Sequence, residues 1–104
     1  MKSRTVLLVA TFALGMSIAA MADGASIFKA KCAMCHGADG SGNTPMGKSM
    51  GLRDLGSAEV QSSSDTDLAA VISNGKGGKM PAYKGKLSDS DISDVVKYIR
   101  TLKK

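Results

Sequence analysis

Hydrophobic side chains recur at helical spacing in three stretches of the chain, and no stretch alternates apolar and polar residues as a strand does. The pattern predicts an all-α fold of three main helices joined by long loops. The first helix places Ile27 and Phe28 on its inner side, and its aromatic content predicts a crossing with the last helix near Phe28 and Tyr98. The second helix carries Leu68, Val71 and Ile72, and the third carries the stripe Ile92, Val95, Val96, Ile99 and Leu102.

Capping residues indicate where two of these helices begin. Ser88 and Asp91 have the spacing of a capping box, in which each side chain bonds to the other residue's backbone N–H. Ser64 and Asp67 repeat this spacing ahead of the second helix. Gly75 can adopt the left-handed conformation that ends a helix. The second helix is therefore expected between residues 64 and 75.

The stretch from residue 37 to residue 63 is rich in Gly, Ser and Met. It predicts a long loop with a short turn of helix near residues 57–61. A loop of this length is uncommon in a compact domain unless another surface supports it. We expect a cofactor to provide that surface.

Residues 1–22 have the pattern of a secretory signal peptide. Lys2 and Arg4 precede an apolar run, which ends in the cleavage sequence Ala20-Met21-Ala22. Cleavage would deliver a domain of residues 23–104, without a membrane span, to the periplasm or another extracytoplasmic compartment. The alternative is an uncleaved anchor, because the uncharged stretch approaches the ~18 residues at which a span becomes possible.

The domain that remains is small and only mildly charged. Removing 22 residues from 104 leaves 82, and a chain of that size usually needs a covalent or metal staple. The whole chain has two Phe, two Tyr and no Trp, so a large flat apolar cofactor would supply much of the missing core. The loss of Lys2 and Arg4 lowers the net charge from +5 to +3, which is too mild to indicate a nucleic-acid partner.

The most specific feature is the pentapeptide Cys32-Ala33-Met34-Cys35-His36. At this spacing two thiols can each add to a vinyl group of one haem, while the adjacent imidazole reaches the iron. A redox disulfide would not require His36 and would be expected in a βαβ setting. A closed zinc site needs four ligands, and the chain has two cysteines and one histidine. The motif therefore predicts one haem c per chain, attached through Cys32 and Cys35 with His36 as an axial ligand.

The second axial ligand can be narrowed from the residues alone. Because His36 is the only histidine, the opposite side of the iron is left to a thioether, to a lysine amine or to no ligand. Of the methionines outside the predicted signal and the motif, Met80 is favoured over Met50 and Met46. Gly77-Gly78 before it permits a close approach of the backbone to the haem, and Pro81 after it fixes the direction in which the chain leaves.

These features together resemble the class I cytochromes c, specifically the small soluble monohaem type of bacteria and algae. The residues that carry the resemblance are Gly24, Phe28, the pentapeptide, the segment Asn74 to Tyr83 and a C-terminal helix with Tyr98. The resemblance implies that the terminal helices cross beside the haem and that His36 and Met80 are the axial ligands. Family members often keep a proline whose carbonyl accepts the imidazole N–H, and Pro45 is the candidate for this role.

An iron with both axial positions filled has no site for a substrate, so we expect a one-electron carrier rather than an enzyme. Lys76, Lys79 and Lys84 lie close to Met80 in sequence and predict a docking surface for acidic redox donors and acceptors, although they could equally be an ordinary solvated face. We expect a monomer. Two alternatives remain open, a haem enzyme or gas sensor in which Met80 dissociates, and a haem subunit of a larger oxidoreductase.

Overall fold

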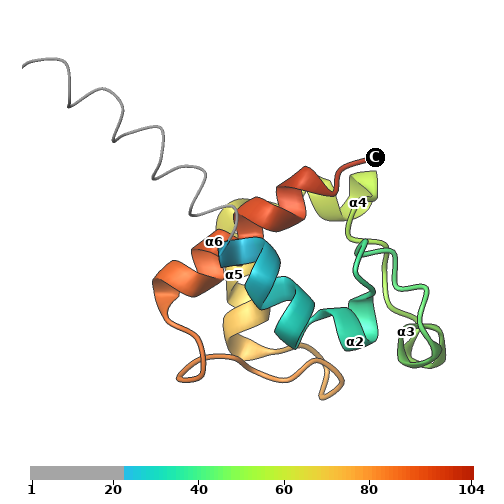
Figure 1. Ribbon diagram of the computed structural model, residues 1–104, viewed down its shortest axis with the longest axis horizontal. Coiled ribbons are helices and arrows are strands. Elements are labelled where there is room, and N and C mark those ends of the chain that lie inside the picture. Colours follow the sequence, from blue (N-terminus) through green and yellow to red (C-terminus); the bar gives the residue numbers. More distant parts are fainter. Residues whose placement is uncertain (1–22) are drawn as a thin grey trace, which may run out of the picture.

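The computed structural model describes residues 23–104, and in this part the chain is helical (Figure 1). The predicted signal segment lies outside the described residues. An N-terminal helix covers residues 23–31 and is followed by α2 (Ala33–His36), α3 (Pro45–Met50), α4 (Ala58–Gln61), α5 (Asp65–Asn74) and α6 (Asp89–Thr101). Outside these helices, the described residues form two isolated bridges, Lys76 with Met80 and Lys84 with Leu87, and no named strand. The prediction of an all-α fold is confirmed.

The capping residues begin α5 and α6 where the sequence predicts. At α6 both bonds of the capping box form, with Asp91 N–H donating to Ser88 Oγ at 3.0 Å and Ser88 N–H donating to the Asp91 carboxylate at 3.2 Å. At α5 the Ser64 hydroxyl accepts from Asp67 N–H at 3.1 Å. The return bond from Ser64 N–H to the Asp67 carboxylate is not among the hydrogen bonds of the described chain. The second cap is therefore half of a capping box.

The core lies where the N-terminal helix and α5 pack against α6 (Figure 1). Phe28 is 1% exposed, and its ring lies 5.2 Å from that of Tyr98, which confirms the predicted crossing. The stripe of α6 is buried as expected, except that Leu102 is half-buried at the edge of the core. The buried residues of this cluster are Phe28, Ile72, Ile92, Val95, Val96 and Ile99.

Gly24 permits the close approach of the two crossing helices. It is buried, and a Cβ atom placed on it would overlap the backbone carbonyl of Asp94 and lie 3.3 Å from Tyr98 Cβ. A rotamer change cannot move a backbone carbonyl. Glycine is thus required here for helix packing.

The prediction of an almost uninterrupted loop from residue 37 to residue 63 is wrong. The segment contains α3, which begins with Thr44 as the N-cap and Pro45 as the first helical residue. Both choices are typical of a helix start, because Pro has no N–H to leave unpaired and its φ angle already suits the helix. The short helical turn expected near residues 57–61 is present as α4. No helix in residues 23–104 is both long and apolar enough to cross a membrane.

Gly24→Ala is expected to destabilise the folded protein by about 1–3 kcal/mol, because the added methyl group must push α6 away. Alanine gains up to about 1 kcal/mol in helix propensity, which the overlap should outweigh. Thermal unfolding followed by circular dichroism should show a midpoint lowered by roughly 4–20 °C. Ala30→Ser, at an exposed position of the same helix, should change stability by less than about 0.5 kcal/mol. An unchanged midpoint for Gly24→Ala would contradict the packing argument.

Candidate haem site

A cavity of about 450 Å³ brings together three of the four predicted haem residues, Cys32, His36 and Met80, whereas Cys35 is not among the residues that line it. Its size falls within the ~300–1,000 Å³ typical of small-molecule and cofactor sites. Cys32 and His36 line it from the motif, and Met80 lines it from the loop after α5. Most of the remaining wall is apolar, as expected for a site that holds a flat hydrophobic group. The apolar wall includes Phe28, Leu52, Leu55, Val60, Leu68, Val71, Ile72, Val95 and Ile99.

The motif is presented to this cavity by a nearly continuous helical path. Cys32 N–H donates to Phe28 C=O at 2.8 Å, and His36 N–H donates to Cys32 C=O at 3.0 Å. Residues three and four apart share a helix face, so Cys32, Cys35 and His36 lie on one side. Met34 lies on the other side and is 78% exposed. This arrangement agrees with its exclusion as an axial ligand.

The protonation of the motif follows from its burial. Burial lowers the pKa of His36, which keeps the imidazole neutral near pH 7, and the neutral ring is the form that binds a metal. Burial, with a smaller contribution from neighbouring Cys35, raises the pKa of Cys32 to about 11. Redox-active Cys-x-x-Cys thiols have a lowered pKa instead. The Cys32 thiol therefore lacks the lowered pKa that is typical of a redox-active cysteine.

Thr44, the N-cap residue of α3, hydrogen-bonds to the backbone of the motif. The Thr44 hydroxyl donates to Cys35 C=O at 2.6 Å and accepts from Gly47 N–H at 2.8 Å. Gly42 N–H also donates to His36 C=O at 2.7 Å. A Cβ on Gly47 would lie 2.6 Å from Cys35 O, so only glycine allows this approach. The sequence interpretation missed Thr44, although a Thr-Pro pair ahead of polar and apolar residues is a recognisable helix start.

His36 Nδ1 is buried and has no hydrogen-bond partner in the described part of the chain. Pro45, whose carbonyl was the candidate acceptor, is the first residue of α3, and it does not accept a hydrogen bond from His36 Nδ1 in this structure. A buried polar atom without a partner costs about 1–3 kcal/mol. The donor set, the apolar walls and the volume all fit a haem.

The loop that carries Met80 is held by its own backbone. Met80 N–H donates to Lys76 C=O and Lys76 N–H donates to Met80 C=O, both at 3.2 Å. Gly75 before it has φ of +75°, and a Cβ there would crowd Met80 O, so glycine is needed at this bend. Tyr83 then joins the loop to the rest of the site, because its hydroxyl donates to Lys31 C=O at 3.0 Å.

The structure leaves Met50 as the competitor of Met80 for the second axial position. Met46 is 46% exposed and does not line the cavity, whereas Met50 lines it from the end of α3. Met80 packs against the core cluster, and Met50 is not among the residues that do. The cavity thus retains the two candidates that the sequence ranked first and second.

The lysines near Met80 are exposed, and Lys76 and Lys79 line the mouth of the cavity. The ion pairs within residues 23–104 are Arg53 with Glu59, Arg100 with Asp65, and Lys104 with Asp54. None of them involves Lys76, Lys79 or Lys84. These ammonium groups are therefore available to other molecules.

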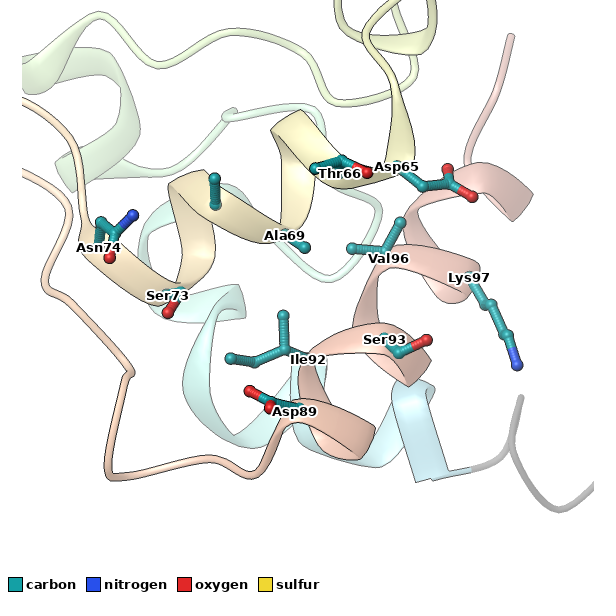
Figure 2. A pocket seen from close by; sticks show the side chains of 11 residues that line it. Asp65, Thr66, Ala69, Ser73, Asn74, Asp89, Ile92, Ser93, Val96 and Lys97 are labelled. Atoms are coloured by element: carbon teal, nitrogen blue, oxygen red, sulfur yellow. The ribbon is translucent and has the colours of Figure 1, made fainter.

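A second hollow lies between α5 and α6, and Figure 2 shows Ala69, Ile92 and Val96 directed into it. Its lining in the described chain includes no Cys, His or Met side chain, so it does not compete as a haem site. Residues 23–104 also contain no group of three or more His, Cys, Asp or Glu side chains placed to hold a metal ion. The zinc alternative considered from the sequence therefore gains no support.

Comparison with known proteins agrees with this geometry. Residues 19–99 match the family model "Cytochrome C oxidase, cbb3-type, subunit III". The chain is 39% identical to cytochrome c6 of Leptolyngbya boryana over 80 residues, which is 75% of this chain and 87% of that protein. It is 39% identical over 79 residues to the cbb3-type cytochrome c oxidase subunit FixP of Azorhizobium caulinodans, which covers 76% of this chain. That match spans only 26% of FixP.

A solved structure confirms the fold. The KustC0563 c-type cytochrome superposes with a TM-score of 0.74 and 32% sequence identity, and covers 79% of this chain and 99% of its own. A helical fold around a cavity with a Cys-x-x-Cys-His motif defines the class of c-type cytochromes. The chain belongs to this family, as a cytochrome c domain of the monohaem class I type that is homologous to cytochrome c6.

Proposed function

We propose that residues 23–104 carry one haem c in the cavity and act as a one-electron carrier between redox proteins. Cys32 and Cys35 would attach the haem, and His36 and Met80 would be its axial ligands. The observation that carries this proposal is the cavity that Cys32, His36 and Met80 line together. Haem supplies an iron centre that accepts and releases one electron.

The polypeptide contributes control over that iron. The neutral imidazole of His36 provides a lone pair, and a Met thioether on the other side favours the ferrous state. Apolar walls would limit water near a bound iron, which would raise its reduction potential further. Because His36 and Met80 would occupy both axial positions, no substrate could coordinate. A role as an enzyme or gas sensor is therefore disfavoured.

The relatives support an electron carrier in one of two arrangements, a separate small protein or a domain of an oxidase subunit. Cytochrome c6 of Leptolyngbya boryana matches this chain over most of its length, which favours a separate small protein. FixP matches over about a quarter of its length, which favours the same domain as part of an oxidase subunit. We propose the first arrangement, with export by residues 1–22 to an extracytoplasmic compartment and a monomeric mature protein. Size-exclusion chromatography and N-terminal sequencing of the exported protein distinguish the two.

Lys76, Lys79 and Lys84 form the docking surface in this proposal. Lys76 and Lys79 line the mouth of the cavity, so a partner that binds them also lies close to the haem. Exposed like charges steer an acidic partner and speed its encounter without requiring tight binding. Fast encounter and quick release suit an electron carrier.

Protein purified from the periplasm should retain its haem colour after denaturation in acidic solvent, because thioether bonds survive unfolding. Absorption spectra of the oxidised and reduced protein should also show a low-spin haem. The variant Cys32→Ala/Cys35→Ala is the control and should lose the colour under the same treatment. Haem that is extracted completely from the natural protein would overturn the covalent site and the proposed function.

Met80→Ala should abolish the weak near-infrared Met–Fe(III) charge-transfer band, because the thioether is removed from the iron. The vacated position should then bind added imidazole or cyanide. Met50→Ala is the matched control, since Met50 lines the same cavity, and it should keep the band. Loss of the band in Met50→Ala with its retention in Met80→Ala would transfer the axial role to Met50.

Electron exchange with an acidic redox protein should slow as ionic strength rises to about 0.15 M, where the Debye length falls to ~8 Å. The double variant Lys76→Gln/Lys79→Gln should lower the low-salt rate by about tenfold and flatten its salt dependence. Lys97→Gln removes one exposed charge from α6, outside the haem cavity, and should have little effect. Equal rates for the double variant and the natural protein would show that these lysines are a solvated face.

A further inference from the structure

The last turn of α6 is tied to the segment around α4 by a cluster of polar contacts that haem ligation does not require. Arg100 Nη1 donates to Gln61 C=O at 2.9 Å, and Nη2 donates to Ser63 C=O at 2.6 Å. The same guanidinium pairs with the Asp65 carboxylate, at 2.9 Å from Nε and 2.7 Å from Nη2. One side chain therefore binds two backbone carbonyls and a carboxylate at once.

Arg100 donates from α6 to the segment around α4, whereas the Gln61 side chain donates from α4 to α6 and to the residues before α4. Its Nε2 donates to Leu55 C=O at 2.8 Å and to Ile99 C=O at 3.0 Å. Leu55 lies before α4 and Ile99 lies within α6, next to Arg100. The Gln61 side chain thus bonds to the segment before α4, and the Arg100 side chain bonds to the C-terminal end of α4 and the residues after it.

This cluster bears on the haem site because the segment it holds is a wall of the cavity. Leu55, Val60 and Ser63 all line the cavity, and Val60 is 8% exposed. α4 has only four residues, which is too short to be stable without tertiary contacts. Its position must therefore be set by what it is attached to.

Few other polar contacts attach this wall. Leu55 N–H donates to Gly40 C=O at 2.8 Å, and Lys104 N–H donates to Gly56 C=O at 3.0 Å. Both lie on the N-terminal side of α4. The C-terminal side, residues 61–63, is attached to α6 by the bonds from Arg100 to Gln61 C=O and Ser63 C=O, together with the bond from Gln61 Nε2 to Ile99 C=O.

We propose that Arg100 is a positioning residue for the haem site, which holds the wall formed by residues 60–63 closed against the cofactor and so helps to set its reduction potential. This inference rests on the proposed function, because it concerns a haem in that cavity. Arg100 is suited to the role because its planar fork can reach several acceptors in fixed directions. Its side chain is 30% exposed, so water competes only partly for these acceptors.

The test compares four proteins, each with haem attached: the natural chain, Arg100→Lys, Asp65→Asn and Lys97→Gln. Lysine keeps the positive charge but cannot reproduce the planar fork. Asp65→Asn weakens the ion pair and leaves the two carbonyl contacts in place. Lys97→Gln removes a positive charge from the same helix without touching residues 60–63 and controls for charge alone.

Two readouts separate positioning from general stability. The first is hydrogen exchange at the backbone amides of Gln61, Ser62 and Ser63, whose N–H groups bond within the α4 region. In Arg100→Lys these amides should exchange about tenfold faster, the factor that corresponds to one net hydrogen bond. The amides of Val95 and Val96, in the middle of α6, should exchange as in the natural protein.

The second readout is the midpoint potential, measured by redox titration. Arg100→Lys should lower it, because a looser wall admits water that favours the ferric state. In Asp65→Asn and Lys97→Gln the backbone amides should exchange as in the natural protein. The midpoint potentials of both variants should lie above that of Arg100→Lys.

Three results would overturn the inference. They are unchanged exchange at residues 61–63, an unchanged potential in Arg100→Lys, and exchange that accelerates equally along the whole chain, which would reveal a merely structural role. A natural protein whose spectrum shows no haem would instead overturn the proposed function first, and the inference with it.

Discussion

The packing of Phe28 between two rings is the contact on which the site depends. Its ring lies 5.2 Å from Tyr98 on α6 and 6.4 Å from His36 in the motif, and the side chain is almost fully buried. One aromatic residue therefore links the helix crossing to the imidazole. The N-terminal helix continues into the motif through the bond from Cys32 N–H to Phe28 C=O, so the crossing also sets the direction in which Cys32 and His36 point. A shift of α6 would be transmitted to the motif through a close-packed core, which deforms little.

The second half of the site is brought to the first by contacts between residues far apart in sequence. Tyr83 N–H donates to Ile72 C=O at 3.0 Å, which fixes the chain after Met80 to the end of α5. The Tyr83 hydroxyl reaches Lys31, one residue before Cys32. The segment that contains Met80 and the segment that contains the motif are thus bonded to each other directly. The cavity between them is a consequence of this connection and of the apolar face of α5.

The sequence predicts those parts of the structure that local patterns determine. The α6 stripe, the Ser88 capping box, the Phe28 and Tyr98 crossing and the cavity that Cys32, His36 and Met80 share all follow from spacing or from the family resemblance. α3 escaped prediction because the Gly, Ser and Met content around it suggested a loop, while its start signal, Thr44 before Pro45, is only two residues long. The contacts of Arg100 escaped because they join residues 35 to 39 positions apart, and an arginine near a helix C-terminus is already explained by the helix dipole. The absence of a partner for His36 Nδ1 in the described chain depends on ring orientation, which no sequence pattern encodes.

The two methionines that line the cavity differ in how much freedom the backbone leaves them. Met50 is the last residue of α3 and is followed by Gly51 in the left-handed conformation, where a Cβ would meet nothing within 4 Å. The Met80 backbone exchanges two hydrogen bonds with the Lys76 backbone, and Tyr83, three residues later, is bonded to Ile72. Met80 also packs on the core. A ligand held before the metal binds loses less conformational entropy on binding than one on an open helix end. Given equal access to the iron, this difference favours Met80, and it explains why the glycines before it matter, since Gly75 allows the tight bend that keeps the Met80 backbone in place.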